Sequence, residues 1–427
     1  MHKVTTSRLL ATVFLSVFMA VNAHASRLFI PMDAEGQANH LKAYGIAYEA
    51  LKQGMTLDWL LNYKGGSFGM EDAPAIVRLC KLRGVTYEEM SDDHYLGIVQ
   101  QIANPDFNGD VIKLEKAPKI AVYTPPNKEP WDDAVTMVLT YAEIPFDKVY
   151  DDEVLADDLH KYDWLHLHHE DFTGQYGKFW MSFRNTTWYQ NDQRSAEAMA
   201  AKHGFKKVSQ LKLAVAKKIR DFVAGGGFMF AMCSATDSYD IALAADGVDI
   251  CEVPFDGDPS DPAAQSKLNF NNCFAFKDFS LLPNPYRYEY SSIDATEIHQ
   301  QTVPMNTDYF SLFTFSAKFD PVPAMLCQDH TTTIKGFMGQ TTGFLKPYLK
   351  SSVLVMGDFK PTNEARYIHG EYGKGTWTFY GGHDPEDYQH NIGDPPTELS
   401  LHPNSPGYRL ILNNVLFPAA KKKPRKT

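Results

Sequence analysis

A cysteine stands where a short apolar stretch gives way to polar residues. Cys233 follows the run 228–232, which is apolar throughout and suits a strand buried on both faces. Ser234 and Asp237 are good N-cap residues, so a helix is expected next. The thiol would then lie at a strand-to-helix corner, where parallel sheets bind ligands and a helix N-terminus favours the thiolate. The alternative interpretation is a small buried cysteine that only fills the corner.

A histidine and a glutamate follow a second expected strand. His383 and Glu386 come after the stretch 375–380, in which threonine and aromatic residues alternate, and after two glycines. A thiol nucleophile needs a base, and the base needs a carboxylate that orients it. We therefore predict a catalytic triad of Cys233, His383 as the base and Glu386 as its orienting acid, assembled at the ends of parallel strands.

A dense group of histidines and carboxylates ends a third expected strand, at 164–169. Alternation along a strand sends successive side chains to opposite sides, so both sides of this strand end are polar. These groups could ligate a divalent metal, line a polar pocket for a sugar-like ligand, or form a polar strand end without a ligand. We favour the pocket and expect neither a metal nor a cofactor. The residues assigned to ligand binding are His168, His169, Glu170, Asp171, Ser234 and Asp384.

The elements that would position these residues alternate between strand and helix, which predicts an α/β fold. For 117–420 we predict a flavodoxin-like, doubly wound parallel sheet. The region 26–116 alternates in the same way and is expected to form an N-terminal βαβ half, also parallel. The stretch from about 247 to 350 is rich in proline, aspartate and asparagine turns, which predicts a loop-rich insertion with few strands.

The two ends of the chain are expected to lie outside the fold. Residues 1–25 have a basic start, an apolar run at 9–21 and a small-residue cleavage pattern ending at Ala25, as in a signal peptide. We therefore expect an exported protein, periplasmic or secreted, whose mature form begins at Ser26. The apolar run is too short to span a bilayer comfortably, and no second candidate span follows. The basic tail 421–427 is expected to be disordered.

Composition narrows the partners and the redox chemistry. The net charge of −11 over 427 residues argues against non-specific nucleic-acid binding, so a small-molecule ligand is the expected partner. Five cysteines are present, and an odd number leaves at least one thiol unpaired in an oxidising compartment. Cys251 and Cys273 flank a turn-rich excursion and form the pair that we would assign to a disulfide.

The region 117–420 resembles the class I glutamine amidotransferase-like superfamily. The similarity lies in a cysteine at a strand-helix corner behind a glycine-rich turn, and in a histidine and a glutamate after a late strand. The ending YGKGTWTFYGGHD at 372–384 is most similar to the trehalose-utilisation (ThuA-like) branch, which usually lacks the catalytic cysteine. The superfamily corner normally reads Gly-x-Cys-x-Gly. Here Ala231 and Ala235 take the glycine positions, and alanine tolerates a positive φ poorly.

The whole chain is similar to exported bacterial proteins labelled asparagine synthetase B, through the stretches 39–45, 58–63 and 168–177. True glutamine-dependent asparagine synthetases resemble an N-terminal-cysteine glutaminase joined to an ATP site. Processing here would expose Ser26, and a glycine-rich phosphate loop is lacking, so ATP-dependent synthesis is not expected. Two hypotheses remain. One is a Cys-dependent hydrolase or amidotransferase for a small polar or saccharide-type ligand, and the other is a non-catalytic ligand- or partner-binding module.

Overall fold

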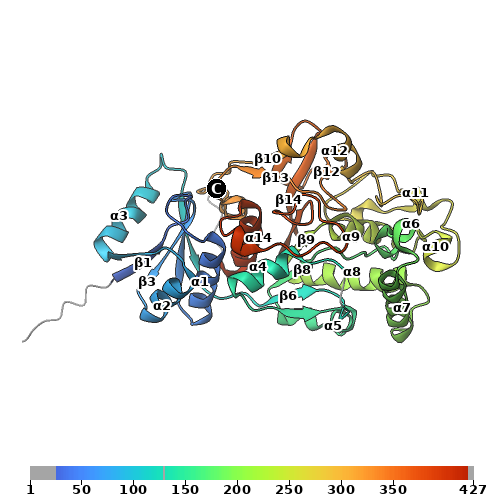
Figure 1. Cartoon of the computed structure of the whole chain (residues 1–427), viewed down its shortest axis with the longest axis horizontal. Coiled ribbons are helices and arrows are strands. Elements are labelled where there is room, and N and C mark those ends of the chain that lie inside the picture. The colour runs from blue at the N-terminus through green and yellow to red at the C-terminus, as the bar shows by residue number, and fades with distance from the viewer. Residues whose placement is uncertain (1–25, 128–129, 422–427) are drawn as a thin grey trace, which may run out of the picture.

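The computed structural model describes residues 26–127 and 130–421. The predicted signal peptide, 1–25, lies outside the described residues, as does the predicted basic tail beyond its first residue. The molecule is elongated and contains two β-sheets (Figure 1). The smaller sheet lies at one end, and the short helices α10 (Val253–Asp256) and α11 (Ala264–Lys267) lie at the other.

The regular elements of the described residues are as follows. The strands are β1 (Ser26–Ile30), β2 (Leu57–Leu61), β3 (Ser67–Glu71), β4 (Glu88–Ser91), β5 (Asp110–Leu114), β6 (Ile120–Tyr123), β7 (Asp147–Val149), β8 (Trp164–Leu167), β9 (Phe228–Met232), β10 (Tyr309–Leu312), β11 (Thr333–Lys335), β12 (Phe344–Leu345), β13 (Leu354–Phe359), β14 (Glu364–Tyr372) and β15 (Gly375–Tyr380). The other α-helices are α1 (His40–Lys52), α2 (Pro74–Arg83), α3 (Asp92–Ala103), α4 (Ala134–Ala142), α5 (Asp151–Leu155), α6 (Trp180–Phe183), α7 (Thr187–Lys202), α8 (Val208–Gly225), α9 (Ala235–Ala244), α12 (Thr296–Thr302), α13 (Pro321–Cys327) and α14 (Pro406–Leu416).

The N-terminal sheet is antiparallel throughout, which corrects the prediction of a parallel βαβ half. Its strand order is β4-β1-β3-β2-β5, and each neighbouring pair is antiparallel. The reason is the turn at 62–66, where Gly65 and Gly66 have positive φ and reverse the chain after β2. A tight turn can join only antiparallel neighbours, because parallel neighbours need a long crossover connection. The glycines therefore mark a hairpin.

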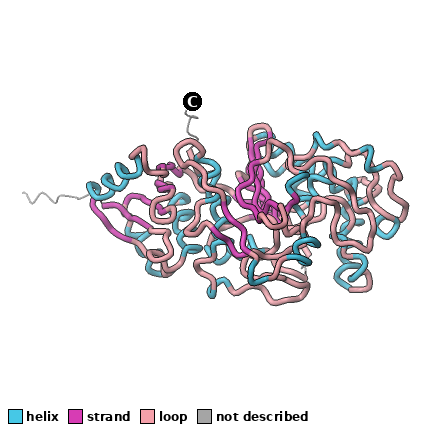
Figure 2. Tube along the Cα trace, turned by 90° about the horizontal axis from the view of Figure 1, so that it is seen from above, coloured by secondary structure: helices cyan, strands magenta, loops and turns pink. Residues whose placement is uncertain are grey.

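The larger sheet has ten strands and mixes parallel with antiparallel pairs, so the protein is a mixed α/β fold. Five strands, in the order β7-β6-β8-β9-β15, pair in parallel. The sheet continues through β14, β13, β10 and β11 with antiparallel pairing, and β12 pairs with β14. The predicted insertion thus contributes three strands to this sheet, and short helices and loops fill the rest of that end (Figure 2).

Three helices, α1, α4 and α14, contact one another between the two sheets (Figure 1). Along β6, Ile120 and Val122 belong to the apolar core that includes these helices, whereas Ala121 and Tyr123 belong to the core on the side of α8. This alternation follows the two-residue period of a strand covered on both faces. The N-terminal sheet and the large sheet therefore share one layer of helices and one core.

The parallel register brings four strand ends to one edge of the large sheet. Tyr123 of β6 is paired with Leu167 of β8, and Leu167 with Ala231 of β9. Met232 of β9 is paired with Tyr380 of β15. Segments that leave these strands therefore begin side by side, as expected for the ligand-binding edge of such sheets.

Across 26–127 and 130–421, every helix is too short or too polar to serve as a bilayer-spanning segment.

The close approach of α1 to α4 predicts that Gly45 is sensitive to substitution. A Cβ atom on Gly45 of α1 would lie 1.8 Å from the carbonyl oxygen of Ala142 in α4. We expect Gly45→Ala to lower the free energy of unfolding by about 1–3 kcal/mol, because the helices must move apart. Gly97→Ala is the matched control in α3, where a Cβ meets no atom within 4 Å. It should raise stability by about 0.5–1 kcal/mol. Urea denaturation measures both, and equal stability of the two variants would contradict the crossing.

Candidate functional site

Cys233 occupies a backbone conformation that is costly for a non-glycine residue. It links β9 to α9 with φ of 51°, in the left-handed region, although alanines flank it. Its N–H donates to the carbonyl of Gly382 over 3.2 Å, and the Ser234 hydroxyl donates to the carbonyl of His169 over 2.9 Å. Such conformations persist where the surroundings impose them, and they concentrate at functional sites. The corner is therefore a tight elbow that needs no flanking glycine.

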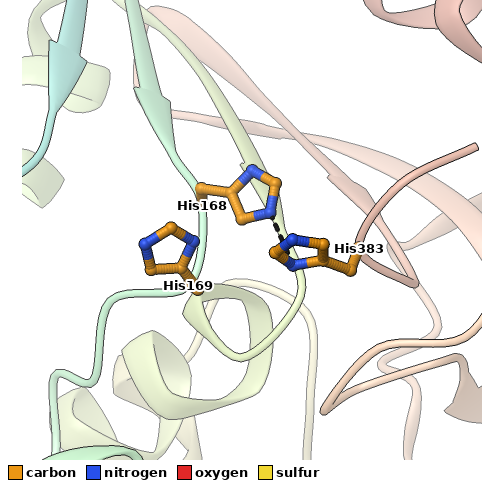
Figure 3. Close-up of side chains that lie close together, drawn as sticks. All are labelled: His168, His169 and His383. Atoms are coloured by element: carbon orange, nitrogen blue, oxygen red, sulfur yellow. Dashed lines mark hydrogen bonds between the residues drawn. The ribbon is translucent and has the colours of Figure 1, made fainter. Parts of the chain in front are cut away.

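His383 follows β15 and lies beside two further groups. Its Nδ1 is 3.0 Å from Nε2 of His168, which ends β8 (Figure 3). Its Nε2 is 3.5 Å from a carboxylate oxygen of Asp132, which precedes α4. Burial acts to lower the pKa of His383, but the neighbouring Asp132 and Cys233 raise it to about 10. The imidazole is therefore protonated at neutral pH.

The charged imidazole of His383 favours the thiolate form of Cys233. Burial acts to raise the pKa of the thiol, but a hydrogen bond and the charge of His383 lower it to about 7. The backbone N–H of Gln340 also donates to Sγ, over 3.4 Å. Between about pH 7 and about pH 10 the pair is a thiolate beside an imidazolium. This is the activated form that thiol nucleophiles use.

Asp133 fixes the tautomer of His168. Burial lowers the pKa of His168 well below its ordinary value, so this ring is neutral. Its Nδ1 lies 3.4 Å from a carboxylate oxygen of Asp133, which also contacts His166 at 3.1 Å and caps α4. Nδ1 of His168 therefore carries the proton, and Nε2 accepts from the protonated Nδ1 of His383.

Glu386 does not take the orienting position at His383 that the sequence predicted. Its carboxylate lies 3.1 Å from Nδ1 of His402, and Asp132 stands beside His383 in its place. Burial acts to raise the pKa of Asp132, but the nearby His383 and His390 hold it below its ordinary value. Glu386 follows His383 by three residues, and at this position in the turn its side chain lies against His402 and not against His383. Asp132 lies on the connection that precedes α4, and no local sequence pattern pointed from it to His383.

The predicted ligand-binding residues divide into two groups. Three of them are engaged in shaping the backbone: Ser234 bonds to the carbonyl of His169, Asp171 accepts from Thr173 and from the N–H of Gly177, and Asp384 accepts from the Thr397 hydroxyl and the N–H of Glu386. His168, His169 and His383 form a compact cluster (Figure 3). Glu170 lies nearby and lines, with Asp171 and His169, a small cavity of about 50 Å³.

A second cavity, of about 230 Å³, opens onto the thiol. Cys233, His169 and His383 line it at one side. The remaining walls combine aromatic rings with amide side chains, and they include Trp131, Phe179, Tyr288, Gln300, Gln340 and Asn391. An apolar wall with a few convergent polar groups is typical of small-molecule sites.

The histidine cluster is also compact enough to hold a metal ion. One ring nitrogen of each of His168, His169 and His383 lies within 4.8 Å of the others, and Asp132, His383 and His390 form a second such group. Imidazole nitrogen and carboxylate oxygen are ligands that zinc accepts. The same nitrogens of His168 and His383 bond to each other, so the cluster also closes as a hydrogen-bonded network.

The thiols of Cys251 and Cys273, the two predicted disulfide partners, form separate hydrogen bonds. Cys251 donates to the carbonyl of Thr173 and Cys273 to the carbonyl of Asp240, each over 3.3 Å. Both are free thiols, so the predicted Cys251–Cys273 disulfide is wrong. The turn-rich segment between Cys251 and Cys273 therefore does not bring the two sulfurs together.

No protein-family model and no curated protein matches the chain. Among solved structures, two cytoplasmic proteins of Salmonella typhimurium are similar over 71% of this chain and 100% of their own. Their sequence identities are 10% and 12%, and both TM-scores are 0.34. A GH42 beta-galactosidase, Gan42B, is similar over 63% of this chain and 28% of its own, with 12% identity and a TM-score of 0.28. At these TM-scores the similarities carry no argument about fold or activity.

The cysteines should differ sharply in reactivity. Burial raises the pKa of Cys80 to about 12 and raises the pKa values of Cys251, Cys273 and Cys327 as well, whereas that of Cys233 is near 7. Iodoacetamide at pH 7 should therefore alkylate Cys233 first, as measured by peptide mass spectrometry. His383→Ala removes the largest influence that lowers the thiol pKa and should slow this alkylation about tenfold or more. His160→Ala, at an exposed histidine, is the control. Alkylation of Cys233 no faster than that of Cys327 would contradict the assignment.

Proposed function

We propose that this protein is a cysteine-dependent hydrolase or amidotransferase of the glutamine amidotransferase-like superfamily. The observation that carries the proposal is that Cys233, in a left-handed elbow, lines the same cavity as His383, which lowers the pKa of the thiol to about 7. Asp132 beside His383 supports the role of an orienting acid.

The strand order supports the flavodoxin-like part of the proposal. Numbered along the chain, the parallel strands β6, β7, β8, β9 and β15 are arranged 2-1-3-4-5, which is the flavodoxin-like order. The elbow cysteine follows the fourth of these strands and His383 follows the fifth. The ThuA-like ending at 372–384 forms the end of β14, the whole of β15 and the turn that carries His383.

The chemistry follows from the protonation states. The thiolate of Cys233 attacks the carbonyl carbon of an amide or ester, and the carbonyl π-electron pair moves onto oxygen. Collapse of this oxyanion breaks the bond to the leaving group, which takes a proton from the His383 imidazolium. Neutral His383 then removes a proton from water, or from an acceptor amine or alcohol, as that nucleophile attacks the thioester. Release of the acyl product restores the thiolate and the imidazolium.

The cavity walls support a small polar or saccharide-type ligand. Trp131, Phe179 and Tyr288 offer ring faces and edges, and Gln300 and Asn391 offer amide donors and acceptors. Together with the predicted export signal at 1–25, this supports an enzyme that acts on a small molecule in the periplasm or outside the cell.

Four substitutions test the roles, with p-nitrophenyl acetate and L-glutamine as probes. Cys233→Ala should abolish release of p-nitrophenol or ammonia, and His383→Ala should lower kcat/KM by about 10²- to 10⁴-fold. Asp132→Asn should lower it less than His383→Ala, because the imidazole remains. Glu386→Gln should have little effect, because Glu386 contacts His402. Full activity of Cys233→Ala would remove the thiol mechanism, and a wild-type protein inert toward both probes would favour a non-catalytic binding module.

The pH profile should follow the ion pair. Activity should rise with pH through about 7, as Cys233 loses its proton, and fall above about 10, as His383 loses the proton that the leaving group needs. The measurement is kcat/KM for ammonia release from L-glutamine across pH 5 to 11, after subtraction of the Cys233→Ala rate, because an amide leaving group needs a proton whereas p-nitrophenolate does not. A flat profile between pH 6 and pH 8 would contradict the pairing.

A further inference from the structure

A loop from the predicted insertion passes directly over the thiol. The segment 338–342 lies between β11 and β12, and the backbone N–H of Gln340 donates to Sγ of Cys233 over 3.4 Å. We propose that this N–H is an oxyanion-hole donor and that the side chain of Gln340 is the positioning residue that aims it. The inference rests on the proposed thiol chemistry and adds a donor that comes from far along the chain.

The direction of this N–H suits the intermediate as well as the free enzyme. In the adduct, the negatively charged oxygen is attached to the carbon that Sγ has just bonded. The proposal places that oxygen on the side of Sγ where the Gln340 N–H lies, within reach of this donor. Preorganised backbone donors of this kind stabilise developing charge without a reorganisation cost at the moment of reaction.

The side chain of Gln340 holds this N–H in place from the other side of the cavity. Its Nε2 donates to the carbonyl of Gly177 over 2.6 Å and to the carbonyl of Tyr288 over 3.0 Å. The N–H of Gly177 in turn donates to the carboxylate of Asp171 over 3.1 Å. Asp171, which the sequence assigned to ligand binding, thus shapes the turn that receives the Gln340 amide.

The rest of the loop is bonded to the strand ends that carry the reacting groups. The N–H of His383 donates to the carbonyl of Met338 over 2.8 Å, and the Thr341 hydroxyl donates to the carboxylate of Asp237 over 2.9 Å. A Cβ on the residue at Gly339 would lie 2.7 Å from the backbone nitrogen of His383, so only glycine fits there. Hydrogen bonds therefore connect the loop 338–342 to both Cys233 and His383, and the side chain of Gln340 anchors the loop to the carbonyls of Gly177 and Tyr288.

Removal of this anchor tests the inference in the full-length protein. Gln340→Ala loses both side-chain hydrogen bonds, and Gln340→Glu keeps the size but places a carboxylate against two carbonyls. Acylation by p-nitrophenyl acetate should fall about tenfold to a hundredfold in both variants. The thiolate titration, followed as absorbance at 240 nm against Cys233→Ser, should shift to higher pH. Gln101→Ala, at an exposed glutamine of α3, is the matched control and should behave as wild type.

The outcomes separate this inference from the function on which it depends. If wild-type Cys233 reacts near pH 7 but neither Gln340 variant changes the titration or the acylation rate, the oxyanion role is overturned and the thiol mechanism stands. If wild-type Cys233 is inert, the proposed function fails first. Thermal unfolding of each variant identifies a general loss of structure, and a folded Gln340→Glu keeps the test valid if Gln340→Ala unfolds.

Discussion

The site depends on one buried hydrogen bond, between two imidazole rings at the ends of β8 and β15. Two ring nitrogens that face each other at 3.0 Å must share one proton, because two lone pairs or two N–H groups would repel. Burial keeps His168 neutral, and the Asp133 carboxylate near its Nδ1 favours the proton on that nitrogen, so His383 supplies the shared proton. The strand between them is β9, which is followed by Cys233. The same bond therefore joins the ends of two strands on either side of the thiol.

The parallel part of the large sheet was predictable because its strands are buried on both faces. Continuous apolar runs such as that of β9 stand out from the polar segments around them, and each polar break marks a strand end. The antiparallel parts were less visible. The strands β3 and β5 are short, and a glycine in β3 and charged residues in β5 interrupt their apolar runs, so neither stands out as a strand in the sequence. The predicted parallel pairing of the N-terminal strands was therefore wrong, although helices between these strands were expected.

The site was predictable only as far as it lies on strand ends. Cys233 and His383 each follow an apolar strand, so their convergence follows from parallel pairing alone. Asp132 and Gln340 lie on connections whose course depends on long-range packing, and neither carries a local pattern that points to the thiol. The spacing between His383 and Glu386 suggested a partnership that the chain does not make, since Glu386 turns toward His402. The spacing of two residues along the chain predicts whether they are neighbours within a helix or strand, because these have a fixed period. A turn has no such period, so spacing does not predict neighbours there.

The shared helix layer ties the N-terminal sheet mechanically to the reacting groups. Helix α4 meets Gly45 of α1 at its last residue, Ala142, and is capped by Asp133, whose carboxylate lies 3.4 Å from Nδ1 of His168. The nine residues of α4 therefore connect α1 to the imidazole pair. The two sheets should consequently melt as a single cooperative unit, in which the proton arrangement at the thiol persists only as long as the distant hairpins remain folded.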